Sequence, residues 1–305
     1  MEKETKKLSF YDQIEKNKRN SVILTISVFI ILMTLVYVIS LIFGVAESFG
    51  ILTIAGVFII IYTLVTYTQG DKIALAAAHA KPVEETDKKY IHLINIVDGL
   101  SIASGIHKPK IFVIESDEIN AFATGNDPNN ASIAVTTGLL KNLKRDEIEG
   151  VIGHEISHIR NYDIRFSTLV AVLVGLVAIV SDILLRSWRY GNLRSSDDRK
   201  GEFSILIVIG ILLAIFSPIV VRLVQFAVSR KREFLADASG AQLTRYPEGL
   251  ASALEKIMKF NKGNLKVSEA VSHLFFVDPT KSALDALYAT HPPIEERIKI
   301  LKAMG

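Results

Sequence analysis

At 305 residues and a net charge of +3, the chain is long enough for a sizeable core and too weakly basic to indicate nucleic-acid binding. Half of its residues are hydrophobic and its mean hydropathy is +0.34, which favours a membrane protein. The absence of cysteine excludes disulfides and thiolate metal sites, so any metal must be bound by His, Asp and Glu.

Two uncharged apolar segments lie near the N-terminus, at residues 21–43 and 49–68. Each is long enough to cross a hydrocarbon core of about 30 Å as a helix. The first is too long for the apolar core of a cleaved signal peptide, which has about 7–15 residues. We therefore expect a transmembrane hairpin over residues 21–68, preceded by an N-terminal segment, 1–20. Because that segment is rich in Lys and Arg, it is expected to be cytoplasmic.

Two further apolar segments, residues 167–185 and 203–224, contain ionisable side chains near their ends. We expect them to form a hydrophobic helix pair, 167–224, that either crosses the membrane or packs as buried core helices. The loop between them, 186–202, is strongly basic and would lie outside the cell if both helices crossed. A hairpin that enters the bilayer without crossing it would resolve this conflict, and the sequence leaves the choice open.

The remaining parts, residues 69–166 and 225–305, are mixed in charge and are predicted to form the two cytosolic parts of one catalytic unit. Residues 84–104 have apolar side chains at helical spacing. Short β-branched segments flanked by turn residues predict a small sheet of about three strands, at Ile111–Ile114, Ala121–Thr124 and Ser132–Thr136, with a turn over residues 125–130. The predicted fold class is mainly α: a membrane protein with about four hydrophobic helices and a cytosolic, zincin-like helical domain that includes this sheet.

A helix predicted from Asp146 to Tyr162 contains the sequence His-Glu-Ile-Ser-His at 154–158. We expect Asp146 to cap this helix, with Glu149 three residues on. Residues at i and i+4 share a helix face, so His154 and His158 can bind one ion. Glu155 could then act as general base toward a water that zinc has made acidic. Chance occurrence of two histidines on a solvated helix is the competing interpretation.

A third ligand is predicted in the sequence Glu-Phe-Leu-Ala-Asp at 233–237, on a second helix that begins near Ser229. Two His and one Glu plus water is a common catalytic zinc set, so we assign Glu233 to the metal. Asp237 would accept the outer N–H of a ligand histidine. Asp163 is left open between a similar role and helix capping. His79, His92, His107 and His273 are not assigned a role.

With these motifs the chain resembles the HtpX family of membrane zinc proteases, relatives of the prenyl-protein endoproteases. The resemblance covers nearly the whole length and is strongest at Val151–Arg160 and Glu233–Asp237. It extends to the sequence Asn-Ala-Phe-Ala at 120–123 and to the stretch from Thr290 to Arg297.

The resemblance implies a multi-pass endopeptidase of the prokaryotic plasma (inner) membrane, with one Zn²⁺ per chain. Its partners would be the lipid bilayer and misfolded or damaged membrane proteins, cleaved at the cytoplasmic face. It further implies that Asn120 and Ala121 lie on an edge strand that binds substrate. His291 would stabilise the oxyanion or approach the zinc, and Arg297 would support the site. From the residues alone, His291 could instead mark the start of a helix over Ile294–Lys302.

Two other functions would share part of this sequence pattern. In intramembrane site-two proteases the same motif lies within an apolar span, whereas here the charged stretch 144–149 precedes it directly. A non-catalytic, zinc-stabilised membrane scaffold or quality-control adaptor would need a structural metal site. Such a site normally has four protein ligands and needs no adjacent carboxylate, so the presence of Glu155 favours an enzyme.

Overall fold

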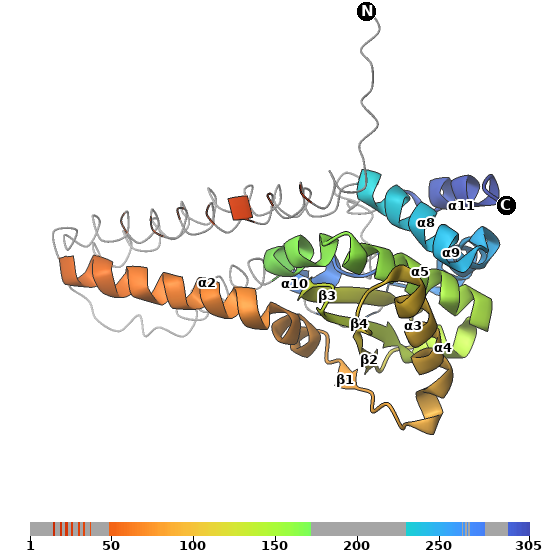
Figure 1. Cartoon of the computed structure of the whole chain (residues 1–305), viewed down its shortest axis with the longest axis horizontal. Coiled ribbons are helices and arrows are strands. Elements are labelled where there is room, and N and C mark those ends of the chain that lie inside the picture. Colours follow the sequence, from red (N-terminus) through yellow and green to blue (C-terminus); the bar gives the residue numbers. More distant parts are fainter. Residues whose placement is uncertain are drawn as a thin grey trace, which may run out of the picture.

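The computed structural model describes residues 49–171, 230–263, 269–277 and 292–305, with Leu265, Val267 and isolated positions before residue 49. These residues form a mainly helical domain around a small sheet, from which one long helix projects (Figure 1). The apolar segment 203–224, the loop 186–202, most of 1–48 and 167–185, and His291 lie outside the described residues.

The projecting helix, α2 (Phe49–Ala77), begins where the second apolar segment begins and continues beyond it. Its first part carries exposed apolar side chains, such as Ile54, Phe58 and Leu64. Its last turns are buried against the sheet through Ala74 and Leu75. Within the described part of the chain, no helix has both the length and the apolar character needed to span a bilayer. The predicted number of membrane helices is therefore not confirmed.

The sheet contains four strands in the order β1-β2-β4-β3. They are β1 (Lys81–Pro82), β2 (Lys110–Ile114), β3 (Ala121–Asp127) and β4 (Asn130–Thr136). The two central strands are parallel, and β1 and β3 pair antiparallel at the edges. The three predicted strands are confirmed. The two-residue strand β1 was missed because so short a segment shows no periodicity, and the turn between β3 and β4 is tighter than predicted.

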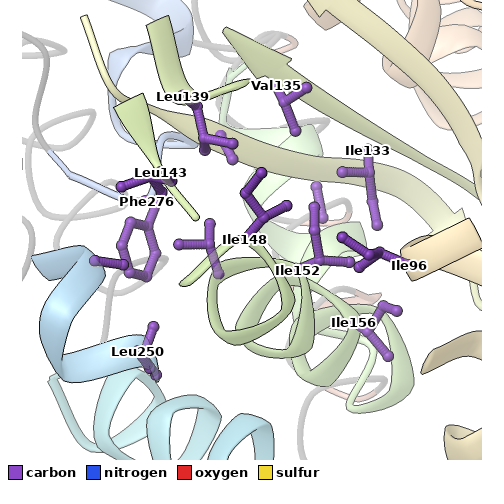
Figure 2. Close-up of a cluster of buried hydrophobic side chains, with 14 of the residues drawn as sticks. Ile96, Ile133, Val135, Leu139, Leu143, Ile148, Ile152, Ile156, Leu250 and Phe276 are labelled. Carbon is purple, nitrogen blue, oxygen red and sulfur yellow. The ribbon is translucent and has the colours of Figure 1, made fainter. Parts of the chain in front are cut away.

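Side chains that alternate along the strands supply two separate cores. One face of the sheet, with Ile133 and Val135, packs on α3 (Ile91–Ser104) and α5 (Arg145–Arg160) to form the larger core (Figure 2). The opposite face, with Phe122 and Ala134, packs on the end of α2.

Helix α5 lies at the centre of the domain, between the sheet and a second group of helices (Figure 1). That group contains α8 (Arg230–Thr244), α9 (Pro247–Phe260) and α11 (Ile294–Lys302). The remaining elements are η1 (Lys88–Tyr90), α4 (Thr137–Asn142) and α10 (Glu269–Ser272). The helix that the sequence suggested over Ile294–Lys302 is present, with Pro293 at its N-cap. A helix with two His on one face is thus surrounded by other elements, rather than exposed to solvent.

The predicted cap of α5 is wrong by two residues. The helix begins at Arg145, so Lys144 is the N-cap residue and Asp146 lies in the first turn. Glu147, rather than Glu149, accepts a hydrogen bond from the backbone N–H of Lys144 at 2.6 Å. Tertiary contacts favour Glu147 in this role, because its carboxylate also accepts hydrogen bonds from Ser252 (2.7 Å) and Lys256 (2.6 Å) on α9.

This network yields a stability prediction. Burial alone would raise the pKa of Glu147, but its bonds to Lys256, to the Lys144 backbone and to Ser252 lower it below 4.5. We expect Glu147→Gln to reduce the free energy of unfolding at pH 7 by about 1.5–3 kcal/mol. A carboxylate with a depressed folded-state pKa stabilises above its unfolded pKa, so the difference from wild type should shrink as the pH falls below about 4.5.

The control is Glu149→Gln, the same substitution on the same helix. Glu149 pairs with Arg145 at 2.9 Å, but the arginine side chain is 74% exposed. This change should cost no more than about 0.5 kcal/mol. Equal losses for the two variants, measured by denaturation in detergent at pH 7 and pH 4, would contradict the assignment.

Candidate metal centre

The centre depends on an unusually close approach of α5 and α8 at two glycines. A Cβ atom on Gly240 would lie 2.8 Å from the backbone nitrogen of His154 and 3.0 Å from the Gly153 carbonyl carbon. A Cβ on Gly153 would meet the carbonyl oxygen of Gly240 at 3.2 Å. Because neither side chain is present, the two backbones touch, and Glu233 on α8 reaches the histidines of α5.

The two histidines and Glu233 converge on one point. The Nε2 atoms of His154 and His158 are 3.1 Å apart. The two carboxylate oxygens of Glu233 lie 3.7 Å from Nε2 of His154 and 3.5 Å from Nε2 of His158. Bonds of about 2.0–2.1 Å to a tetrahedral ion would separate such atoms by about 3.3–3.4 Å. The observed distances fit a small divalent cation. Within the part of the chain that the structure describes, these are the residues whose donor atoms cluster in this way.

The outer nitrogen of each imidazole contacts an aspartate. Nδ1 of His154 lies 2.8 Å from Asp237, and Nδ1 of His158 lies 3.0 Å from Asp163. Because an ionised carboxylate can only accept, the proton is assigned to Nδ1 in both rings, which leaves the Nε2 atoms free of hydrogen and able to bind a cation. Asp163 therefore holds a ligand imidazole, one of the two roles that the sequence left open.

Arg297 supports the first of these pairs from the core. It is fully buried and donates to both carboxylate oxygens of Asp237, at 2.8 and 2.7 Å. Burial would raise the pKa of Asp237, but the charge and hydrogen bonds of Arg297 lower it to about 2. The guanidinium also lies 4.5 Å from the ring of Phe276, which packs edge-on against His154.

The two imidazoles have opposite pKa shifts. Burial lowers the pKa of His154 to about 4, despite its bond to Asp237. Burial acts in the same direction on His158, but Asp163, Glu233 and Glu155 outweigh it and raise that pKa to about 9. The carboxylates around His158 thus favour a positive charge at this point, and a bound cation would supply that charge.

Glu155 is buried beside the cluster and lines the same pocket. Burial is the largest influence and raises its pKa to about 7, with Glu233 acting in the same direction against the opposing effect of His158. The backbone N–H of Ala123 on β3 donates to its carboxylate. A carboxylate whose pKa lies near neutrality suits proton transfer at physiological pH.

The residues predicted to bind substrate lie at the start of edge strand β3, and the chain's own segment 276–277 already occupies their polar groups. The N–H of Phe276 donates to the Ala121 carbonyl at 2.7 Å. The Asn120 amide donates to the Val277 carbonyl at 2.7 Å and accepts from the Val277 N–H at 3.2 Å. Asn120 is therefore fully buried and holds this segment in place.

Several pocket residues were not found from the sequence. His273, left unassigned, lines the pocket and contacts the Ser167 carbonyl at 3.2 Å. Arg232, to which no role was assigned from the sequence, also lines the pocket and contacts Asp163 at 3.5 Å. No spacing rule could have identified either residue, because their positions depend on how α8 and the segment 269–277 pack. Of the predicted site residues, His291 lies outside the described part of the chain.

The site combines a His-Glu-x-x-His helix, a glutamate from a second helix and the buried carboxylate of Glu155 beside them. This combination defines a metallopeptidase. Residues 87–305 match the description "Peptidase family M48". The chain therefore belongs to peptidase family M48. The resemblance of its sequence motifs to HtpX proteases is confirmed by relatives that are 40–47% identical over most of the chain.

Curated relatives carry the description "Protease HtpX homolog". The protein from Thermoanaerobacter pseudethanolicus is 46% identical over 83% of this chain and 84% of its own length. That from Dictyoglomus thermophilum is 44% identical over 98% and 96%, and that from Streptococcus pyogenes is 40% identical over 96% and 99%. A crystal structure of S. mikatae Ste24p aligns with a TM-score of 0.46 and 21% identity, over 88% of this chain and 62% of that one.

The contact between glycines predicts a strong effect of a small substitution. Gly240→Ala should push α8 away from α5, because the new methyl would meet backbone atoms at 2.8–3.1 Å that cannot rotate aside. We expect a loss of about 1–3 kcal/mol in stability and weaker metal binding, measured by denaturation and by competition with a zinc chelator. Gly99→Ala on α3 is the matched control, since its Cβ meets nothing within 4 Å. If both variants bind metal like wild type, the contact does not position Glu233.

Proposed function

We propose that the chain is a zinc-dependent endopeptidase that cleaves misfolded or damaged membrane proteins at the cytoplasmic face of a prokaryotic plasma membrane. The observation that carries this proposal is the convergence of His154, His158 and Glu233 beside the buried Glu155. Zinc is favoured because two imidazoles and one carboxylate are a common catalytic donor set for this ion, here at suitable spacing.

Zinc supplies Lewis acidity, which polarises a scissile carbonyl and makes a water molecule acidic. Within the chain, His154, His158 and Glu233 would hold the ion, one per chain, while Asp237 and Asp163 fix the two rings through Nδ1. Glu155 would take a proton from the attacking water and later deliver it to the leaving amine. His291 would stabilise the oxyanion or approach the zinc, the two roles that the family resemblance implies.

An extended substrate would pair with the free side of edge strand β3. Because backbone groups at i and i+2 point to the same side, Ala123 faces away from β4 as Ala121 does. Ala123 also lines the pocket that contains the metal residues. The segment 276–277 blocks the start of the strand, and the N–H of Ala123 already donates to Glu155. We therefore infer that substrate binding centres on the carbonyl of Ala123, with Asn120 and Ala121 fixing the wall at the end of the cleft.

The membrane location rests on the apolar segments 21–43 and 49–68 and on the Lys- and Arg-rich segment 1–20, which favours a cytoplasmic N-terminus. An even number of apolar segments separates His154 from Glu233, so both would lie on the same side of the bilayer. Membrane proteins exposed at that face are the substrates that the HtpX resemblance favours.

The catalytic assignment predicts that two neighbouring substitutions have different effects. Glu155→Gln should retain bound zinc but fail to cleave casein or a detergent-solubilised membrane protein, because an amide cannot take a proton from water. His154→Ala should lose the metal itself. Zinc would be measured by elemental analysis of purified protein, and activity with and without a chelator. Full activity of Glu155→Gln would reject this general base, and the scaffold alternative predicts no cleavage even by wild type.

The membrane assignment has its own test. The full chain expressed in bacteria should remain with the membrane pellet after an alkaline carbonate wash, because apolar helices in the hydrocarbon core are not released when surface charges are disrupted. Release into the supernatant would contradict a spanning topology and would leave the metallopeptidase assignment intact.

A further inference from the structure

Two similar chains of contacts hold the two imidazoles of the metal centre. Each runs from a histidine through an aspartate to an arginine. The His154 arm consists of His154, Asp237 and Arg297, and the His158 arm consists of His158, Asp163 and Arg232. The first arm contains the residues that sequence motifs predict, whereas Arg232 has no predicted role.

We propose that Arg232 is a positioning residue of the metal centre, which acts through Asp163 to fix the imidazole of His158 toward the cation. This inference rests on the proposed function, because it requires a cation between His158 and Glu233.

The geometry of Asp163 carries the first step. One carboxylate oxygen accepts from Nδ1 of His158 at 3.0 Å, and the other lies 3.5 Å from a guanidinium nitrogen of Arg232. A carboxylate held at both oxygens cannot rotate freely, so the ring that it contacts is held as well. Removing the arginine would leave only one of these two restraints.

The position of Arg232 carries the second step. It precedes Glu233 on α8, and its guanidinium lies 5.7 Å from the ring of Phe166. The same turn of α8 therefore supplies the metal ligand Glu233 and the arginine that contacts Asp163, the residue behind His158. By contrast, Arg230 and Lys231 on this turn are exposed.

Exposure makes the His158 arm more dependent on such a contact than the His154 arm. The side chains of His158 and Arg232 are 16% and 13% exposed, whereas those of His154 and Arg297 are 1% and 0% exposed. Tight packing restrains the buried arm in addition to its hydrogen bonds. The His158 arm borders the open pocket, where less packing surrounds it. The ionic contact with Arg232 therefore contributes a larger part of what holds the His158 ring in place.

Charge balance supports the same role. The described residues of the centre include four carboxylates and two guanidiniums. The carboxylates belong to Glu155, Asp163, Glu233 and Asp237, and the guanidiniums to Arg232 and Arg297. Two guanidiniums and a divalent cation carry four positive charges, the number that balances these four carboxylates once Glu155 has released its proton. Loss of Arg232 would leave an uncompensated negative charge beside His158.

The test compares zinc affinities of the full chain in detergent by competition with a fluorescent chelator. Arg232→Met keeps the aliphatic stem but removes the cation, and it should weaken binding by about 10- to 100-fold. Arg232→Lys keeps a charge near Asp163 and should give an intermediate affinity. Lys231→Gln, the exposed neighbour, should bind zinc like wild type. Thermal melting of the metal-free proteins reports whether each variant is folded.

A double-mutant cycle tests whether Arg232 acts through Asp163. Asp163→Asn retains an oxygen that can accept from His158 but removes the charge that attracts Arg232. In the Asp163→Asn background, Arg232→Met should lower the zinc affinity further by less than about twofold. If Arg232→Met does not fold, the same comparison is made with Arg232→Lys. Equal losses in both backgrounds, or wild-type affinity of Arg232→Met, would overturn the proposal.

The result separates this inference from the proposed function. If wild type binds no zinc, or His154→Ala binds as well as wild type, the metal site itself is wrong. If wild type binds zinc and His154→Ala does not, but Arg232→Met matches wild type, only the role of Arg232 is rejected.

Discussion

The contact of two helix backbones at Gly153 and Gly240 is the constraint on which the centre depends. Helix α5 supplies both histidines, but a pair of histidines on one helix is not yet a metal site. Only when α8 lies against it, without intervening side chains, do Glu233 and Asp237 reach His154 from either side of its ring. The small residues that permit this approach therefore matter for chemistry, although they contribute no functional group.

Around this contact the fold places polar groups in order of their distance from the reacting centre. The Nε2 atoms and the Glu233 carboxylate face inward, the aspartates lie behind the rings, and arginines lie behind the aspartates. Each buried charge thereby has a partner, which offsets the high free-energy cost of isolating an ion from water. Glu155 differs from the other carboxylates in its pKa, which burial raises to about 7, so that it is able to exchange a proton.

The local parts of this arrangement could be predicted from sequence, and the parts that depend on packing could not. Helical spacing places His154 beside His158 and Glu233 beside Asp237, because one turn of helix sets both distances. Asp163 lies past the end of α5, and it returns to His158 because Tyr162 adopts a left-handed conformation (φ 60°). Phe276 and Arg232 reach the site through contacts between distant segments, which leave no periodic trace in the sequence.

The contact between Asp237 and Arg297 has a consequence for biosynthesis. His154 and Arg297 are 143 residues apart, so ribosomes adding roughly 5–20 residues per second need about 7–30 s to make the second after the first. During that interval the nascent polypeptide has both imidazoles but lacks the guanidinium that holds Asp237, the aspartate in contact with His154. The polar support of His154 is therefore complete only after the last helix, α11, has been translated and has docked.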